Sequence, residues 1–310
     1  MPATGATLRT RRGAILLYAK DINQKVRQLF DLPHGIWIWW LAGLLGLLVG
    51  SFLNVVIHRL PLMLERRWAL ECAELSGQTA APQPALSLAR PRSRCPACGT
   101  PLRWQQNIPL LSYLLLRGRC ADCHTPISWR YPLVELLTGL LFASVVARHG
   151  ASLAGLAGCG LAAALVALAF IDWDTTLLPD DITLPLLWAG LVAAALGWNP
   201  VALADALWGA VAGYLSLWSV YWAFKFATGK EGMGYGDFKL LAALGAWFGW
   251  QALIPMVLLA SLSGAMAGIA LKLRGNLREG GYIPFGPFLA LGGLWALLFG
   301  PDSFLQWINP

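Results

Sequence analysis

Two short stretches, far apart in the sequence, each place an aspartate at the end of a long apolar run. Asp172 ends the run that precedes the Leu-Pro-Asp of residues 178–180, and Asp237 lies within the Gly-Tyr-Gly-Asp-Phe-Lys of residues 234–239. A carboxylate is costly to hold near a bilayer, so an aspartate in such a place indicates a functional site. Two carboxyl groups that share a proton can polarise a water molecule and protonate a leaving amine, which is the chemistry of an aspartic protease.

The residues around the two aspartates support this chemistry and also leave a structural alternative open. Gly234 and Gly236 let the backbone approach a substrate strand closely and adopt positive φ. In the alternative, the aspartates cap helices, and Asp237 stands where a helix is expected to begin and would be a good N-cap. Three further acidic residues either form helix entries or make the mouth of the site negative, which would favour a basic ligand: Asp174, Asp180 and Asp181.

Four of the six cysteines form two Cys-x-x-Cys pairs, Cys95 with Cys98 and Cys120 with Cys123, with 21 residues between the pairs. Two such pairs supply the four thiolates of a tetrahedral zinc site, and a small segment that buries little apolar area is stabilised by a metal. Four thiolates leave no open coordination position, so such a zinc ion is structural. The alternative is two disulfides or two redox pairs, but two matched pairs in a reducing compartment favour zinc.

The composition excludes an ordinary water-soluble protein. The chain has 310 residues, of which 57% are hydrophobic and 13% are charged, whereas soluble domains carry about 25% charged residues. Because so few charges cannot cover a water-facing surface, we expect a polytopic membrane protein. The net charge of +7 is explained by the positive-inside bias of membrane proteins, so we expect no nucleic-acid partner.

Eight apolar runs predict an all-α polytopic membrane protein with about eight transmembrane helices and a small cytoplasmic zinc-binding module between helices 1 and 2. A spanning helix needs about 20 apolar residues, which most of the runs approach. The runs are residues 36–58, 131–148, 152–172, 182–198, 202–225, 237–250, 251–272 and 283–300. The predicted organisation is an N-terminal tail (1–35), a first transmembrane helix (36–61), the cytoplasmic four-cysteine module (62–130), a transmembrane core (131–300) and a C-terminal tail (301–310).

The charges of the loops predict how these helices are oriented. Lysines and arginines gather in the 62–130 segment and around the later loops on the same side, which places that side in the cytoplasm. The basic tail, residues 1–35, then lies on the outer side against this bias, unless it forms a surface helix. In this orientation Asp172 closes the third helix and Asp237 opens the sixth helix at the same cytoplasmic face. We therefore expect the two carboxylates on one side of the membrane.

Four separated blocks carry a resemblance to a known family. They are residues 50–61, residues 94–135 with both cysteine pairs, Asp172 with residues 178–180, and residues 234–239. In these blocks the chain resembles the bacterial type IV prepilin peptidases, which are GxGD-type membrane aspartyl proteases and bifunctional leader peptidase/N-methyltransferases. A lone Gly-x-Gly-Asp is a weak signal, but four blocks in this order are highly specific, and together they cover about residues 40–300.

The resemblance implies a catalytic pair and two activities. The family's first aspartate precedes Leu-Pro-Asp by a fixed gap, which selects Asp172 rather than Asp174, and its second is the aspartate of Gly-x-Gly-Asp, here Asp237. It implies that the enzyme cuts the short basic leader from type IV prepilins and pseudopilins, after a glycine, at the cytoplasmic face of the bacterial inner membrane. It also implies methylation of the new N-terminal residue from S-adenosylmethionine, the activity to which one zinc ion in the cysteine module is linked.

Two other functions compete with this one. In the first alternative the protein is a peptidase only, with a structural zinc module. In the second it is a proton-coupled transporter whose membrane aspartates relay protons. Relay carboxylates tend to lie in mid-helix, whereas Asp172 and Asp237 are expected at helix ends. No Gly-rich nucleotide fingerprint follows a strand, so the pattern does not locate the methyl donor. The sequence indicates neither the oligomeric state nor whether the substrate belongs to a type IV pilus or a type II secretion system.

Overall fold

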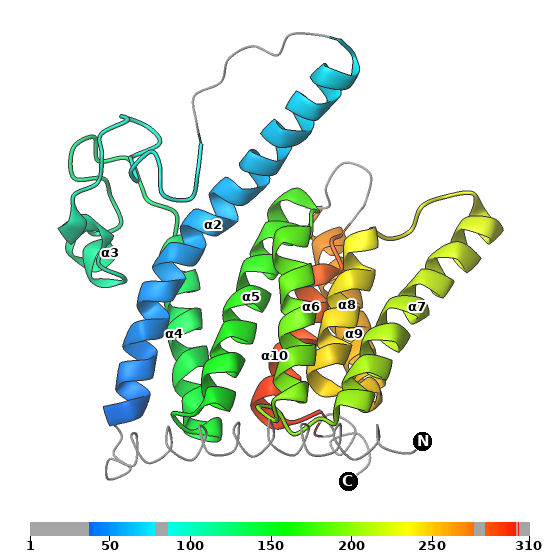
Figure 1. Ribbon diagram of the computed structural model, residues 1–310. Helices are drawn as coiled ribbons and strands as arrows, with labels where there is room; N and C mark the ends of the chain where they lie inside the picture. Colours follow the sequence, from blue (N-terminus) through cyan, green and yellow to red (C-terminus); the bar gives the residue numbers. More distant parts are fainter. Residues whose placement is uncertain (1–36, 78–85, 276–282, 302, 304–310) are drawn as a thin grey trace, which may run out of the picture. The chain divides into compact units, whose positions relative to one another are not determined.

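The computed structural model describes residues 37–77, 86–275, 283–301 and 303, and every regular element within these ranges is helical (Figure 1). The β-type pairings in the same ranges are two isolated bridges, Arg94 with Pro101 and Arg119 with Pro126. The prediction of an all-α protein is confirmed. The predicted N-terminal tail, residues 1–35, and most of the predicted C-terminal tail lie outside the described residues.

Each predicted apolar run falls on a helix of the described chain. These helices are α2 (Trp37–Leu75), α4 (Arg130–His149), α5 (Leu153–Thr175), α6 (Asp180–Ala195), α7 (Leu203–Thr228), α8 (Tyr235–Phe248), α9 (Leu253–Leu273) and α10 (Gly286–Phe299). Three short elements lie between them, η1 (Trp104–Asn107), α3 (Leu111–Leu115) and η2 (Trp250–Ala252). The hydrophobic pattern therefore placed the main helices.

Five helical stretches among the described residues are long and apolar enough to cross a membrane. They are α2, α4, α5, α7 and the stretch Trp250–Leu273, which joins η2 to α9. The other three long helices, α6, α8 and α10, have 16, 14 and 14 residues. At about 1.5 Å per residue they are shorter than a hydrocarbon core of about 30 Å. The number of eight complete spans therefore stays a prediction.

The chain forms two compact units. We call residues 39–143 the cysteine unit, because it holds the four paired cysteines with α2, α3 and the first part of α4. We call residues 1–38 with 144–310 the aspartate unit, because its described part holds both predicted catalytic aspartates on α5 to α10. The two kinds of predicted site thus belong to different units.

In the cysteine unit, α2 packs against the beginning of α4 at a glycine. A Cβ at Gly50 would lie 2.7 Å from the Cα of Glu135, so only glycine permits this approach. Small residues let helices come close in a membrane. Asn54 adds a polar contact between the same helices, since its Nδ2 donates to the carbonyl oxygens of Gly50 (3.3 Å) and Tyr131 (3.1 Å).

The helix α2 is longer than a membrane span. It continues through Pro61 to Leu75, so the first part of the segment predicted to be the cysteine module (62–130) is helical. Its 39 residues extend about 58 Å at about 1.5 Å per residue, roughly twice the thickness of a hydrocarbon core. The C-terminal part of α2 therefore extends beyond the bilayer that its N-terminal part can cross.

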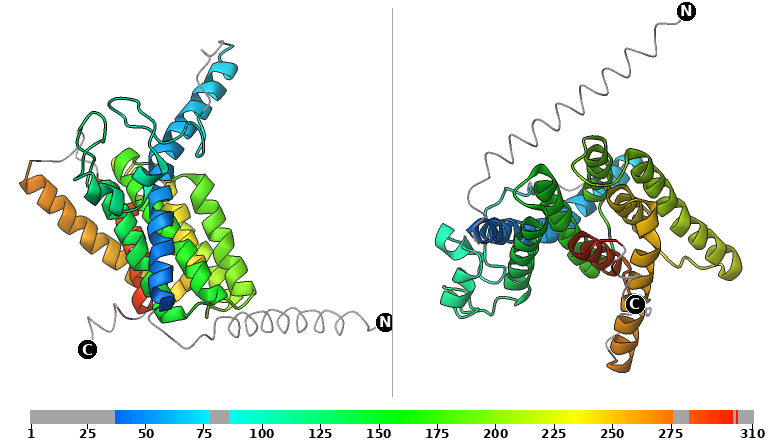
Figure 2. Two further views of the ribbon diagram at one scale, coloured as in Figure 1. Left: turned by 90° about the vertical axis from the view of Figure 1, so that its left-hand side faces the viewer. Right: turned by 90° about the horizontal axis from the view of Figure 1, so that it is seen from below.

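The helix α8 is the buried centre of the aspartate unit. It packs against α6, α7 and α10, and it lies between α6 and α7 in Figure 1; Figure 2 shows the same helices from two other sides. Every residue from Asp237 to Trp247 is buried except Lys239. The contact with α7 depends on a glycine, because a Cβ at Gly213 would lie 2.6 Å from the carbonyl oxygen of Leu241. A helix that is apolar all round is expected in such a position.

Candidate active site and metal centre

Asp172 lies in the last turn of α5 and is buried, with 5% of its surface exposed. The helix ends because Thr176 adopts a left-handed conformation (φ 55°), and the N–H of Thr176 donates to the carbonyl oxygen of Asp172 at 2.8 Å. The Oδ2 of Asp172 accepts a hydrogen bond from the N–H of Gly286 at 2.9 Å. Gly286 is the first residue of α10, so this carboxyl group also lies at the positive end of a helix dipole.

Asp237 lies in the first turn of α8, and 4% of its surface is exposed. The N-cap of this helix is Gly234, and the N–H of Asp237 donates to the carbonyl oxygen of Gly234 at 3.3 Å. The alternative that Asp237 is the N-cap is therefore wrong. Within the described chain the Oδ1 of Asp237 has no hydrogen-bond partner. An unpaired oxygen of a buried carboxyl group is costly, so a hydrogen bond from a water or a substrate would be favourable there.

One leucine brings together the backbone segments around the two aspartates. A Cβ at Gly236 would lie 2.7 Å from the Cβ of Leu178, and a Cβ at Gly286 would lie 3.1 Å from the Cδ1 of the same leucine. Leu178 lies in the connection between α5 and α6, and its side chain is buried. The structure thus places the two predicted aspartates in one buried site, while their catalytic role stays a prediction.

Gly286 is a member of this site that the sequence analysis missed. A Cβ at this position would lie 2.5 Å from the Oδ2 of Asp172, so a larger residue would displace the carboxyl group. The available signal was Phe-Gly-Pro at residues 285–287, where a proline in the first turn indicates the start of a helix. That signal does not predict a contact with a residue 114 positions earlier.

The two glycines predicted to admit a substrate strand have different surroundings. The Cα of Gly236 faces Leu178, so its missing side chain makes room for packing within the protein. A Cβ at Gly234 would have the Oδ2 of Asp237 as its nearest neighbour, at 3.9 Å. Space therefore adjoins the second aspartate at Gly234. This difference favours Gly234 over Gly236 as the place where a substrate would pass.

The acidic residues at the mouth of the site are partly neutralised. Both carboxylate oxygens of Asp180, in the first turn of α6, lie 2.7 Å from the Nζ of Lys239 on α8. Such a pair between exposed groups contributes only about 0–1 kcal/mol to stability, but it removes one net negative charge. Asp174 and Asp181 are also exposed. The mouth is therefore less negative than the three aspartates suggested.

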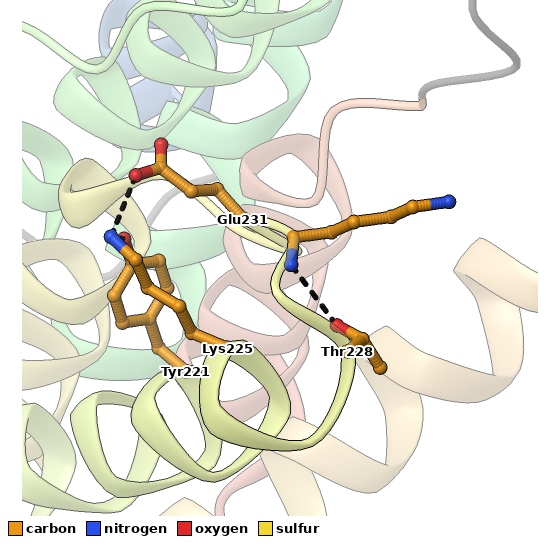
Figure 3. Close-up of polar contacts among 5 residues, drawn as sticks. Tyr221, Lys225, Thr228 and Glu231 are labelled. Carbon is orange, nitrogen blue, oxygen red and sulfur yellow. Dashed lines mark hydrogen bonds and ion pairs between the residues drawn. The ribbon is translucent and has the colours of Figure 1, made fainter.

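An ion pair with a lysine holds the segment between α7 and α8 in place, as Figure 3 shows. Lys225, in the last turn of α7, donates to the Oε1 of Glu231 at 2.9 Å and to the hydroxyl oxygen of Tyr221 at 3.2 Å. Its Nζ also lies 5.5 Å from the centre of the Tyr221 ring, a cation–π distance. The hydrogen bond from Lys225 holds the pKa of the Glu231 carboxyl group below its usual range. Glu231 precedes Asp237 by six residues, so this ion pair holds the segment that connects α7 to the second aspartate against the end of α7.

Replacing Lys225 with methionine is expected to lower the thermal unfolding temperature slightly at pH 7. A carboxyl group with a lowered pKa in the folded state adds stability above its unfolded pKa of about 4.3, and this contribution is lost as the pH falls through the folded pKa. The difference from the unaltered protein should therefore shrink in acid. Thermal unfolding in detergent at pH 7 and at acid pH measures it, with Lys230→Met, an exposed lysine on the same segment, as the control. An equal effect at both pH values would contradict the prediction.

The four paired cysteines lie together in the cysteine unit. Their Sγ atoms are all within 4.8 Å of one another, and those of Cys95 and Cys123 are 3.7 Å apart. Four sulfurs at about 2.3 Å from a tetrahedral zinc ion have a similar spacing. All six cysteines of the chain are free, so the structure does not contain the alternative disulfides. The residues present fit a four-thiolate metal site.

The cysteine pairs belong to an internal repeat. Residues 94–104 and 119–129 share the pattern Arg-Cys-x-x-Cys-x-Thr-Pro-x-x-Trp. In each copy the N–H of the first cysteine donates to the carbonyl oxygen of the threonine, at 3.0 Å and 2.9 Å. The second thiols, Cys98 and Cys123, form hydrogen bonds with the hydroxyl groups of their threonines, which lower the pKa of both thiols, to about 6 for Cys123. The pKa of Cys95, in contrast, is raised to about 11, so the fit to a metal rests on the positions of the four sulfurs.

Comparison with known proteins covers both units. The family model described as the bacterial peptidase A24 N-terminal domain matches residues 44–149, and the model of the type IV leader peptidase family matches residues 159–269. A protein of Aeromonas hydrophila is 56% identical over 90% of this chain and 97% of its own length. Proteins of Pseudomonas aeruginosa and Burkholderia pseudomallei (strain 1026b) are 54% and 52% identical, over 83% and 88% of this chain and 89% of their own lengths. No solved structure matches the chain.

These matches agree with the motifs and with the geometry. All three relatives are named prepilin leader peptidase/N-methyltransferase. The first family match contains the four cysteines, and the second contains Asp172 and Asp237. More than half of the aligned residues are identical in each relative, over most of both chains. The chain therefore belongs to the type IV leader peptidase family.

Proposed function

We propose that this protein cleaves the leader peptide from type IV prepilins and pseudopilins and then methylates the new N-terminal residue from S-adenosylmethionine. The names of its relatives support both activities. The observation that carries the peptidase activity is the buried site that contains Asp172 and Asp237, in which the N–H of Gly286 holds one of the carboxyl groups. Such a pair suits amide hydrolysis without a covalent intermediate.

In the proposed mechanism the two carboxyl groups share one proton, because two like charges in one buried site do not both ionise. The ionised carboxylate takes a proton from a water molecule while the water oxygen bonds to the scissile carbonyl carbon. The protonated carboxyl group stabilises the developing oxyanion with a hydrogen bond. The proton taken from water then passes to the leaving nitrogen as the C–N bond breaks, which restores the starting state of the pair.

The surroundings of the two carboxyl groups support a fixed position for Asp172 and contact with the water molecule for Asp237. The N–H of Gly286 fixes the position of the Asp172 carboxyl group, so it needs no rearrangement during the reaction. The Oδ1 of Asp237, buried and without a partner in the described chain, is the atom available to a water molecule. The space beside Gly234 adjoins the same carboxyl group.

We place the aspartate pair at the cytoplasmic face of the bacterial inner membrane. Loop charges support this side, because lysines and arginines are concentrated on it. Asp172 ends α5 and Asp237 begins α8, so both carboxyl groups lie near helix ends rather than in mid-helix. A basic leader that remains in the cytoplasm would reach them from that side.

We further propose that Cys95, Cys98, Cys120 and Cys123 hold one zinc ion. Zinc bound by four thiolates has no open position, so it would order the surrounding segment and would not activate a substrate. The repeat supplies the ligands in two equivalent turns, each with a threonine whose hydroxyl oxygen accepts a hydrogen bond from the second thiol. The resemblance to the family links this segment to methyl transfer.

Replacing Cys95 and Cys98 with serine is expected to remove the zinc and to impair methylation more than cleavage. Two lost thiolates leave a site that binds zinc weakly, and the segment that depends on the metal loosens. Metal analysis of the purified protein should give about one zinc per chain before the change and almost none after it. The matched control is Cys72→Ser, because Cys72 is an exposed cysteine outside the cluster. Equal loss of both activities, or full retention of zinc, would contradict the proposal.

One assay tests both proposed activities. Membranes that contain the protein are incubated with a prepilin and methyl-labelled S-adenosylmethionine, and mass spectrometry examines the product. We expect a shortened pilin whose first residue carries one labelled methyl group. A shortened pilin without the methyl group would leave a peptidase only, and an uncut prepilin would refute the proposed function.

A further inference from the structure

The short helix α3 exposes three leucines on one face. Leu111, Leu114 and Leu115 are spaced at i, i+3 and i+4, so they share one side of the helix, and Leu114 and Leu115 are 70% and 74% exposed. Packing occupies another side, because the N–H of Gly118 donates to the carbonyl oxygen of Tyr113 at 2.9 Å and a Cβ at Gly118 would lie 3.0 Å from the tyrosine ring. All three leucines are exposed, so they are not packed inside the module.

Two further large apolar residues of the same module, both tryptophans, are exposed. Trp104 and Trp129 are the last residues of the two copies of the cysteine repeat, and they are 76% and 69% exposed. The element η1, which begins at Trp104, packs against α3. Tryptophan is enriched where a membrane meets water, because its ring is apolar and its N–H is polar. We call the three leucines and two tryptophans the leucine–tryptophan surface.

A hydrogen bond fixes the level of this surface along α4. The N–H of Leu110, the residue before α3, donates to the Oε2 of Glu135 at 2.8 Å, and Figures 1 and 2 show α3 beside the first turns of α4. The 20 residues of α4 span about 30 Å, so the whole helix is needed to cross a hydrocarbon core. Glu135 follows Arg130 by about 7–8 Å along the helix axis. If α4 enters the membrane at Arg130, Leu110 therefore lies about 7–8 Å below the membrane surface. Interfacial helices lie at a similar depth, about 5–10 Å.

The charge of the same segment suits an anionic surface. Residues 88–130 contain seven arginines and one aspartate. Three exposed arginines are neighbours of the leucine–tryptophan surface in sequence, since Arg103 precedes Trp104, and Arg117 and Arg119 follow α3. Arginines beside leucine and tryptophan are typical of segments that bind anionic membranes.

We infer that the cysteine module docks on the cytoplasmic leaflet of its own membrane, with the leucine–tryptophan surface at the acyl boundary and the arginines on anionic headgroups. The inference rests on α4 crossing the membrane, for which it is long and apolar enough, and on the cytoplasmic face named in the proposed function, but it does not depend on the reaction. The segment predicted to be a cytoplasmic module would then lie at the bilayer surface. A substrate whose own helix lies in the bilayer would present its new N-terminus at the same level.

Photo-crosslinking in nanodiscs tests the docking with the full chain. A benzophenone amino acid replaces Leu115, an exposed position, in protein reconstituted into phosphatidylcholine with phosphatidylglycerol, and mass spectrometry identifies the adducts. We expect lipid adducts at Leu115 and several-fold fewer at Glu74, an exposed position near the protruding end of α2 in the same unit. Changing Arg117 and Arg119 to glutamine should lower the yield of anionic-lipid adducts, by about fivefold for each arginine.

Two results would overturn the inference. One is equal lipid adduct at Leu115 and Glu74, and the other is an adduct at Leu115 with a second copy of the chain or another protein in place of lipid. A second variant carries the benzophenone at Leu114 and should give the same lipid adducts, which shows that the result does not depend on the substitution at Leu115. Prepilin cleavage is measured in the same nanodiscs, so a protein that crosslinks to lipid but does not cleave would refute the proposed function alone.

Discussion

Asp172→Asn and Asp237→Asn are each expected to lower the rate of leader cleavage by about 10²–10⁴-fold, the usual contribution of general acid–base catalysis. An asparagine keeps the shape of the aspartate but can neither take a proton from water nor return one to the leaving nitrogen. Both carboxyl groups are needed, because one must be ionised while the other is protonated. The buried side chains can keep their positions, since the amide can accept the hydrogen bond that Asp172 receives from Gly286.

The matched control for this prediction is Asp174→Asn. Asp174 lies two residues beyond Asp172, near the same end of α5, and is exposed. Its replacement should leave cleavage nearly unchanged. Rates are measured with a purified prepilin in detergent, and thermal unfolding shows whether each variant is folded. If Asp172→Asn and Asp237→Asn cleave at the normal rate, or if Asp174→Asn is as damaging as either, the assignment of the pair is wrong.

Gly286→Ala is expected to reduce cleavage by about 10²-fold, the effect of displacing a catalytic group by about 1 Å. The new Cβ would lie 2.5 Å from the Oδ2 of Asp172 and 3.1 Å from the Cδ1 of Leu178, so the carboxyl group must move. The movement also breaks or lengthens the 2.9 Å hydrogen bond from the N–H of Gly286. A single methyl group, at a residue that donates only a backbone hydrogen bond, would thus act on the first aspartate.

A defect in folding is separated from a defect in the site by two comparisons. Gly160→Ala is the matched control, because a Cβ at Gly160 on α5 would meet no atom within 4 Å, and it should cleave normally. Methylation of a pilin that is already cleaved should also survive in Gly286→Ala, since the cysteine module belongs to the other unit. Normal cleavage by Gly286→Ala, or loss of methylation together with cleavage, would show that Gly286 does not act through Asp172.

The aspartates were predictable because their signal is local. A carboxylate at the end of an apolar run conflicts with its surroundings, and the conflict is visible in a few residues around Asp172 and Asp237. The four cysteines were predictable for the same reason, since two short pairs define a ligand set whose Sγ atoms do lie together. The helices followed from apolar runs alone, which is the strongest signal that a membrane sequence carries.

The residues that support the aspartates were not predictable, because their contacts join distant parts of the chain. Gly286 contacts a residue 114 positions earlier, and Lys239 pairs with Asp180, 59 positions earlier. Nothing in a helix start or in a lone lysine indicates such a partner. The length of α2 was missed for another reason: the apolar run ends near residue 58, but the helix continues beyond it, through Pro61, to Leu75. A proline inside a helix loses one backbone hydrogen bond and its ring crowds the preceding turn, at a cost of about 3 kcal/mol that tertiary packing can offset.

The enclosure of α8 has a consequence for membranes of different thickness. Lipid-facing helices answer a thicker or thinner bilayer by tilting or by deforming the lipid around them. The 14 residues of α8 are surrounded by α6, α7 and α10, so protein rather than lipid determines where this helix begins and ends. The position of Asp237 relative to its neighbours should then be independent of acyl-chain length. Mismatch would be absorbed by the longer helices with lipid contact, and the same catalytic geometry could serve cells whose lipids change with growth temperature.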